Sequence, residues 1–62
     1  MDTIHEWAKN RTNELREDIR EYILLGWDVR EAVEFVLAPS TIGAGYKAQI
    51  RYEFKYYKES NP

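Results

Sequence analysis

An unbroken alternation of side-chain types runs from Tyr46 to Tyr57 and constrains the fold more than any other feature of this sequence. Its apolar face reads Tyr46, Ala48, Ile50, Tyr52, Phe54 and Tyr56. Its mainly polar face reads Lys47, Gln49, Arg51, Glu53, Lys55 and Tyr57. A period of two is typical of a half-buried β-strand, and a strand needs a neighbour that takes its backbone hydrogen bonds. The alternation therefore predicts a strand over residues 46–57, and the fold depends on where its partner lies.

The chain has 62 residues, which allows one small domain. A domain of this size buries only about 60 % of the surface that its unfolded chain exposes, so its stability is marginal. There is no cysteine and a single histidine, which excludes a disulfide framework and disfavours a structural zinc site. Two Trp, five Tyr and two Phe leave aromatic packing and self-association as the remaining means of stabilisation.

Residues 3–25 are predicted to form one amphipathic helix. Steps of 100° per residue place its apolar side chains in one sector, with Thr12 inside it: Ile4, Ala8, Leu15, Ile19, Tyr22 and Ile23. Gly26 is the natural left-handed residue at the end of the helix. We expect Trp27 to close the corner that follows.

Residues 28–38 fit two structures. As a helix they would be capped by Asp28, and their apolar residues recur at helical spacing: Val29, Ala32, Val33, Val36 and Leu37. As a strand they would alternate from Val33 to Leu37, where β-branched and aromatic residues are dense. We favour the strand, because it gives the strand at residues 46–57 a partner within the chain.

The predicted fold is therefore α+β. A long helix over about residues 3–25 packs on an antiparallel hairpin of strands at about 32–40 and 46–57, and residues 59–62 form a tail. Two strands leave open sheet edges, which are usually covered or paired, so we expect a homodimer with a continued sheet. The alternative is an α-α-β arrangement in which the last strand pairs between two chains.

Four carboxylates lie three and four residues apart on the predicted first helix: Glu14, Glu17, Asp18 and Glu21. A solvated surface is their ordinary role, recognition by a basic partner is the alternative, and metal binding or catalysis is disfavoured because no carboxylate elsewhere opposes them. Trp7 and Leu25 project toward the same flank. We expect wide packing to cover them, whereas an exposed Trp would be a binding hot spot. The candidate partner-binding residues are thus Trp7 and these four carboxylates.

The charge is uneven, at −4 over residues 1–38 and +2 over residues 39–62. The basic residues of the C-terminal part, interleaved with tyrosines, are Lys47, Arg51, Lys55 and Lys58. Aromatic side chains can stack on bases while cations contact phosphates, so these four residues are the candidate site for nucleic acid. The alternation gives most aromatics to one face and most cations to the other, which favours a half-buried strand over a nucleic-acid platform.

Two short resemblances concern the predicted corner. The run from Tyr22 to Trp27 followed by Glu34-Phe35 resembles the helix-to-strand corner of rubisco small subunits. If residues 28–38 are helical, Leu24-Leu25-Gly26-Trp27 with Ala32 and Leu37 resembles a ubiquitin-associated domain whose third helix is replaced by a strand. Neither resemblance carries a function over to this chain.

No catalytic, metal-binding or cofactor-binding motif is present in the sequence, and so small a domain has little room for a walled pocket. We therefore predict a non-enzymatic protein that binds another protein as a regulator or inhibitor and acts as a homodimer, with nucleic-acid binding as the alternative. Its N-terminal residues do not resemble a signal peptide, and no apolar run approaches the roughly 20 residues of a membrane span. These features predict a cytoplasmic protein without membrane contact.

Overall fold

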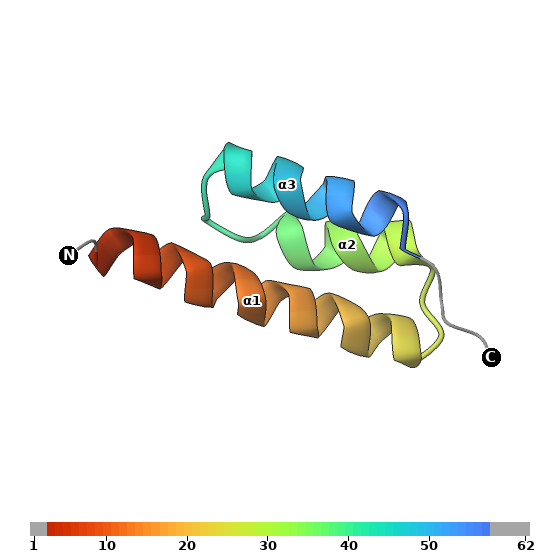
Figure 1. Cartoon of the computed structure of the whole chain (residues 1–62). Coiled ribbons are helices and arrows are strands. Elements are labelled where there is room, and N and C mark those ends of the chain that lie inside the picture. Colours follow the sequence, from red (N-terminus) through yellow and green to blue (C-terminus); the bar gives the residue numbers. More distant parts are fainter. Residues whose placement is uncertain (1–2, 58–62) are drawn as a thin grey trace.

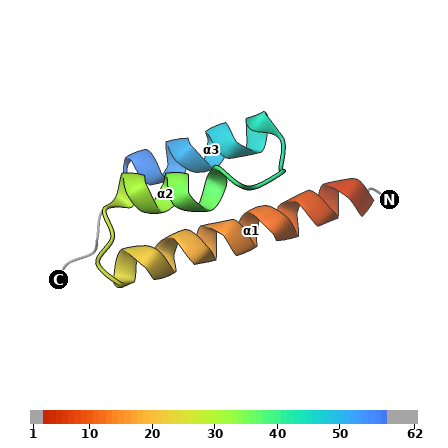
Figure 2. The same ribbon diagram turned by 180° about the vertical axis from the view of Figure 1, so that it is seen from behind.

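The computed structural model describes the backbone of residues 3–57 and the side chains of residues 6–57. Three helices follow one another: α1 at Thr3–Leu24, α2 at Val29–Leu37 and α3 at Ala44–Lys55. The long α1 runs alongside the shorter pair of α2 and α3 (Figures 1 and 2), and the molecule measures 42 × 23 × 18 Å. Lys58 and the predicted tail at residues 59–62 lie outside the described residues.

The predicted α+β fold is wrong, because residues 3–57 contain three helices and no strand. The segment predicted as a strand at 32–40 lies mainly in α2, and the segment predicted at 46–57 lies mainly in α3. The α-α-β alternative fails as well, since its last element is also a helix. A continued sheet therefore cannot join two copies through these residues, and the physical reason for expecting a homodimer is lost.

The first helix ends within one residue of its predicted boundary. The Gly26 amide donates to the Ile23 carbonyl at 3.0 Å, and the Trp27 amide donates to the Tyr22 carbonyl at 3.0 Å. This pair of bonds is the Schellman motif, which requires a left-handed residue between helix and loop. Gly26 supplies it with φ +105°. The sequence thus stops α1 and turns the chain within three residues.

A helix cap decides the structure of residues 28–38. The Asp28 carboxylate accepts the amides of Arg30 at 3.1 Å and Glu31 at 3.4 Å. These bonds satisfy amides at the start of α2 that have no partner inside the helix. The buried residues of α2 are those that the helical interpretation places together: Ala32, Val33, Val36 and Leu37. The strand interpretation was wrong here because a local cap and a helical apolar face already satisfied the segment.

With α2 helical, residues 46–57 have no neighbouring strand, and a helix satisfies their backbone groups internally. Ile50 and Phe54, four residues apart, form the buried anchors of α3, while Tyr57 beyond its end is half-buried. The strand interpretation placed Tyr52 and Tyr56 on the buried face, but each is 65 % exposed. Ile50 and Phe54, the two buried residues of α3, fit a period of two and a helical face equally well. The alternation therefore does not distinguish a strand from a helix at these two positions.

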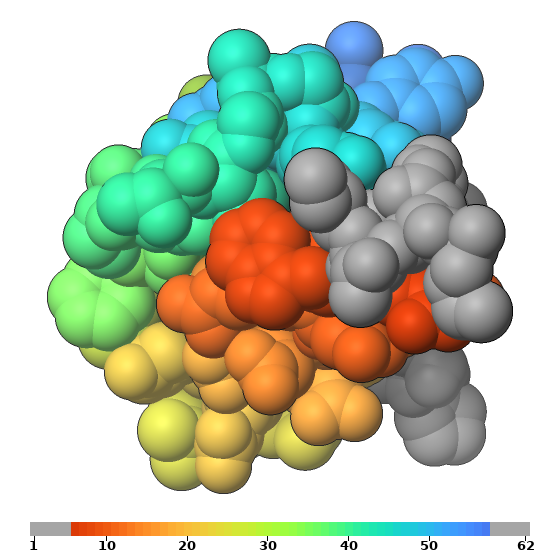
Figure 3. Space-filling model, turned by 90° about the vertical axis from the view of Figure 1, so that its left-hand side faces the viewer, coloured from red at the N-terminus to blue at the C-terminus, as the bar shows by residue number. Residues whose placement is uncertain are grey.

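The core lies where all three helices meet. Its buried members come from α1, α2, the second loop and α3: Leu15, Ile19, Ile23, Ala32, Val33, Val36, Leu37, Ile42, Ile50 and Phe54. Ala8 and Thr12 are also buried on the same face of α1, as the predicted apolar sector requires. Ile4 belongs to that sector, but its side chain lies outside the described ones. Seen from the end at which α1 begins, the loop after α2 and the start of α3 cover the upper part of the molecule (Figure 3).

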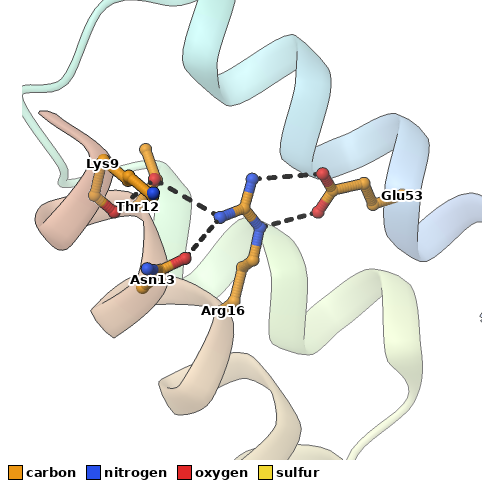
Figure 4. Close-up of polar contacts among 5 residues, drawn as sticks. All are labelled: Lys9, Thr12, Asn13, Arg16 and Glu53. Atoms are coloured by element: carbon orange, nitrogen blue, oxygen red, sulfur yellow. Dashed lines mark hydrogen bonds and ion pairs between the residues drawn. The ribbon is translucent and has the colours of Figure 1, made fainter. Parts of the chain in front are cut away.

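Arg16 ties α1 to α3. Its Nε donates to Glu53 Oε1 at 2.7 Å and its Nη2 to Glu53 Oε2 at 3.1 Å. Figure 4 shows that the same guanidinium also reaches Asn13 Oδ1, at 2.9 Å, and the buried Thr12 hydroxyl, at 3.4 Å. Thr12 in turn donates to the Lys9 carbonyl at 2.9 Å. Two parallel bonds to one carboxylate fix the angle as well as the distance between the two helices.

Candidate protein-binding surface

Three aromatic rings meet at the corner between α1 and α2, and we call Tyr22, Trp27 and Phe35 the aromatic cluster. Ring centroids are 4.8 Å apart for Tyr22 and Trp27, 5.2 Å for Tyr22 and Phe35, and 4.9 Å for Trp27 and Phe35. All three pairs are tilted or edge-on, which are favourable ring geometries. Tyr22 is half-buried, but Trp27 is 37 % exposed and Phe35 is 54 % exposed. The cluster therefore closes the corner, as predicted for Trp27, and also presents aromatic surface to solvent.

A shallow open groove of about 290 Å³ begins at the aromatic cluster and follows the seam between α1 and α2. We call it the α1–α2 groove. Its walls combine apolar and charged side chains with the residues that follow α2: Arg11, Leu15, Asp18, Tyr22, Phe35, Val36, Pro39 and Ser40. Its size lies just below the range of about 300 to 1,000 Å³ that is typical of small-molecule pockets. A groove of this size and openness can receive a side chain of a partner.

The four carboxylates predicted to bind a partner are all exposed on α1: Glu14, Glu17, Asp18 and Glu21. Asp18 lines the α1–α2 groove. Glu14 accepts a hydrogen bond from Arg11 Nη1 at 2.9 Å, so part of its charge is offset inside the chain. Glu17 is adjacent to Asp18 in sequence, which on a helix turns it about 100° away. The structure thus brings one of the four carboxylates, Asp18, into the groove.

The expectation that wide packing covers Trp7 and Leu25 is wrong. Trp7 is 58 % exposed and Leu25 is 71 % exposed. Trp7 precedes Tyr22 by fifteen residues of α1, which is about 22 Å at 1.5 Å per residue. Trp7 and the aromatic cluster therefore lie at opposite ends of α1, and the structure does not combine them into one patch.

Three of the four candidate nucleic-acid residues, Lys47, Arg51 and Lys55, lie on α3. Arg51 Nε and Nη2 donate to the two Glu34 carboxylate oxygens at 2.8 and 3.1 Å. Hydrogen bonding from Arg51 lowers the pKa of Glu34, attraction to Arg51 and Lys47 adds to this effect, and slight burial opposes it. Because Arg51 is held by a carboxylate, one of the four predicted cations is partly neutralised within the chain.

A second and larger groove of about 760 Å³ lies between the start of α2 and the end of α3, and we call it the α2–α3 groove. Its charged lining is mixed and contains three cations and two anions: Arg30, Arg51, Lys55, Asp28 and Glu34. Lys55 Nζ also lies 5.6 Å from the ring centre of Tyr56. Within residues 6–57, no group of three His, Asp or Glu side chains is arranged to hold a metal ion.

Phe35 is the surface residue that the sequence analysis missed. The strand interpretation of residues 32–40 places Phe35 on one face with Val33 and Leu37. In the helical interpretation of the same segment, Phe35 is the one large apolar residue that falls outside the apolar face. An aromatic side chain displaced from an otherwise regular apolar face was therefore the available signal.

Protein-family models, curated proteins and solved structures were compared with this chain, and none of them matches it. Among residues 3–57, no helix is long and apolar enough to cross a membrane.

Proposed function

We propose that this chain is a small cytoplasmic, non-enzymatic protein that binds another protein through the aromatic cluster and the adjoining α1–α2 groove. The observation that carries the proposal is the exposure of Trp27 and Phe35 in one three-ring contact. Aromatic residues are enriched at interface hot spots, where they bury a large area at low entropic cost. An aromatic group at the mouth of a groove therefore supports binding more strongly than scattered exposed apolar residues do.

A second pair of exposed aromatic residues provides a comparison for the aromatic cluster. Tyr52 on α3 and Tyr56 just beyond its end form another exposed ring contact, with centroids 5.6 Å apart, but they do not line either groove. They resemble the cluster in residue type and exposure and differ from it in lacking an adjoining cavity. This difference makes Tyr52 a matched control for Phe35.

The test is a quantitative pull-down with the full chain from the cells that make it, followed by mass spectrometry. Three baits are compared, namely the wild type, Phe35→Ser and Tyr52→Ser, each first shown to be helical by circular dichroism. We expect one or more proteins to be retained by the wild type and Tyr52→Ser and lost with Phe35→Ser. Retention by all three baits, or loss with both variants, would contradict the assignment of the surface.

Self-association is a separate prediction that now needs a helical interface. Size exclusion with light scattering distinguishes the two states, and Phe35→Ser shows whether the same surface is used. A wild-type dimer that becomes a monomer in Phe35→Ser would make a second copy the partner. A dimer that persists in Phe35→Ser would place self-association elsewhere.

A further inference from the structure

The shape of the α1–α2 groove limits what can bind there. Most of its lining comes from two helices, with Leu15 and Tyr22 on α1 and Phe35 and Val36 on α2, and the residues after α2 complete it. Residues 3–57 offer no strand edge, so an extended peptide cannot add a strand to this part of the chain. An apolar seam between two helices fits the recognition mode in which an amphipathic helix inserts its apolar side chains into a groove.

The charge around the α1–α2 groove determines whether a basic or an acidic helix is favoured there. Arg11 is paired with Glu14, which leaves Asp18 as the unbalanced charge in the lining. Two further exposed carboxylates lie one helical turn from residues that line the groove. Glu21 follows Asp18 by one turn of α1, and Glu31 precedes Phe35 by one turn of α2. A partner with Lys or Arg beside its apolar anchors would meet opposite charge along this seam.

The α2–α3 groove on the other side of α2 has the opposite preference. Arg51 is paired with Glu34 in its lining, which leaves Arg30 and Lys55 against Asp28. A basic helix would therefore meet a small excess of positive charge there and an excess of negative charge at the α1–α2 groove.

We propose that the α1–α2 groove binds a basic amphipathic helix of the partner, with its apolar side chains against the aromatic cluster and its Lys or Arg side chains against Asp18 and Glu31. This inference rests on the proposed function and adds the chemical class of the partner segment. The partner helix needs apolar residues spaced three and four apart, which matches the length of seam from Leu15 to Tyr22.

The experiment uses a designed peptide of about 15 residues, long enough to form a helix on binding. It carries Leu at helical spacing, Lys elsewhere and no Trp. A second peptide has the same Leu positions and Glu in place of Lys, and a third has the Lys peptide's composition in scrambled order. Because the chain has two tryptophans, Trp7→Phe leaves Trp27 as the sole Trp reporter in the cluster. A blue shift of Trp27 emission on titration measures coverage of the aromatic cluster, where Trp27 contacts two residues of the groove lining, Tyr22 and Phe35.

We expect the Lys peptide to bind at least about tenfold more tightly than the Glu peptide or the scrambled peptide, which is the size of effect that charge matching and a central anchor produce. In the same background, Phe35→Ala or the pair Asp18→Asn and Glu31→Gln should each weaken binding by about tenfold. Tyr52→Ala and Glu17→Gln should change the affinity by less than about twofold, as surface substitutions outside an interface do.

Three results would overturn the inference. One is equal binding of the Lys and Glu peptides, another is equal loss in the Glu17 control, and the third is an absence of binding by the Lys peptide. If the Lys peptide fails while the pull-down still depends on Phe35, the partner class is wrong and the proposed function stands. If the pull-down does not depend on Phe35 either, both are wrong.

Discussion

The corner between α1 and α2 and the contact that holds α3 are stabilised by different means. At the corner, the determinants are consecutive in sequence: Gly26 provides the turn, Trp27 packs on Tyr22 and Asp28 caps the next helix. The third helix is held by residues far apart in sequence, because Glu53 bonds Arg16 and Arg51 bonds Glu34. The comparison shows that the corner between α1 and α2, which carries the candidate surface, is determined by neighbours in sequence. The position of α3 depends on contacts between residues far apart in sequence.

This difference has a consequence for binding. All three rings of the aromatic cluster belong to α1, α2 and the corner between them, and none belongs to α3. The α1–α2 groove is also lined without any residue of α3. The surface should therefore tolerate changes on the outside of α3, and it should be lost when the core that α3 completes is lost.

The largest expected effect is the loss of an apolar anchor of α3. Phe54 is buried to 5 % exposure, and its ring also contacts Tyr57 with centroids 5.3 Å apart. Phe54→Ala should lower the free energy of unfolding by about 3 to 5 kcal/mol, through lost burial and the cavity left behind. A small domain has little more than that in total, so the variant should be largely unfolded in urea-denaturation and circular-dichroism measurements.

Phe35→Ala removes the same side-chain atoms from a position that is half exposed, and it is the matched control. It should cost clearly less than Phe54→Ala. Equal costs for the two substitutions would mean that the aromatic cluster is as essential to the core as the anchor of α3.

The next effect tests the corner. Gly26 has φ +105°, where a side chain is strained, although a Cβ added there would meet no atom within 4 Å. Gly26→Ala should therefore destabilise through the backbone alone, by about 1 to 2 kcal/mol. Gly45 is an exposed glycine within α3, and an added Cβ there also meets nothing within 4 Å. Gly45→Ala should stabilise by about 0.5 kcal/mol, because alanine favours the helix. Thermal unfolding that shifts both variants in the same direction would contradict this assignment.

The difference between local and long-range determinants also explains which elements could be predicted from the sequence. The end of α1 at Gly26 and the packing of Trp27 at the corner are predictable, because each depends on neighbours in sequence. The state of residues 46–57 is not predictable from their own alternation, because Ile50 and Phe54 suit a strand and a helix. It follows from the helical state of α2, which the Asp28 cap favours. The exposed acidic face of α1 was predictable from the sequence, whereas the place of Phe35 in the same groove as Asp18 required the correct state of α2.

A smaller effect concerns the two bidentate ion pairs of α3. The Arg16 side chain is 19 % exposed and its Glu53 partner 39 %, against 45 % and 48 % for Arg51 and Glu34. Less solvent around the first pair strengthens its interaction. A double-mutant cycle with Arg16→Met and Glu53→Gln should give a coupling of about 1 kcal/mol, and a cycle on Arg51 and Glu34 should give a smaller one. A larger coupling energy for Arg51 and Glu34 than for Arg16 and Glu53 would show that solvent exposure does not determine which pair is stronger.

The smallest effect is a titration that reports whether Arg51 holds Glu34 in solution. The hydrogen bond from Arg51 lowers the pKa of Glu34 from its usual 4.5, and the Arg51 pKa is raised by the same contact. A carboxyl group with a lowered pKa stabilises the folded chain at pH values above 4.5. That contribution is lost as the pH falls below 4.5 through the folded-state pKa, because protons then bind the unfolded chain more readily.

Carbon NMR of the Glu34 carboxyl should therefore show a midpoint below 4.5 in the wild type and a higher midpoint in Arg51→Gln. Lys47→Gln should raise the midpoint less, because attraction to Lys47 is the smallest of the contributions that lower this pKa. If Arg51→Gln leaves the midpoint where it was, Arg51 is free in solution and available to an anionic ligand. The α2–α3 groove would then regain the cation that nucleic-acid binding requires, and the two sides of α2 would both be candidate binding surfaces.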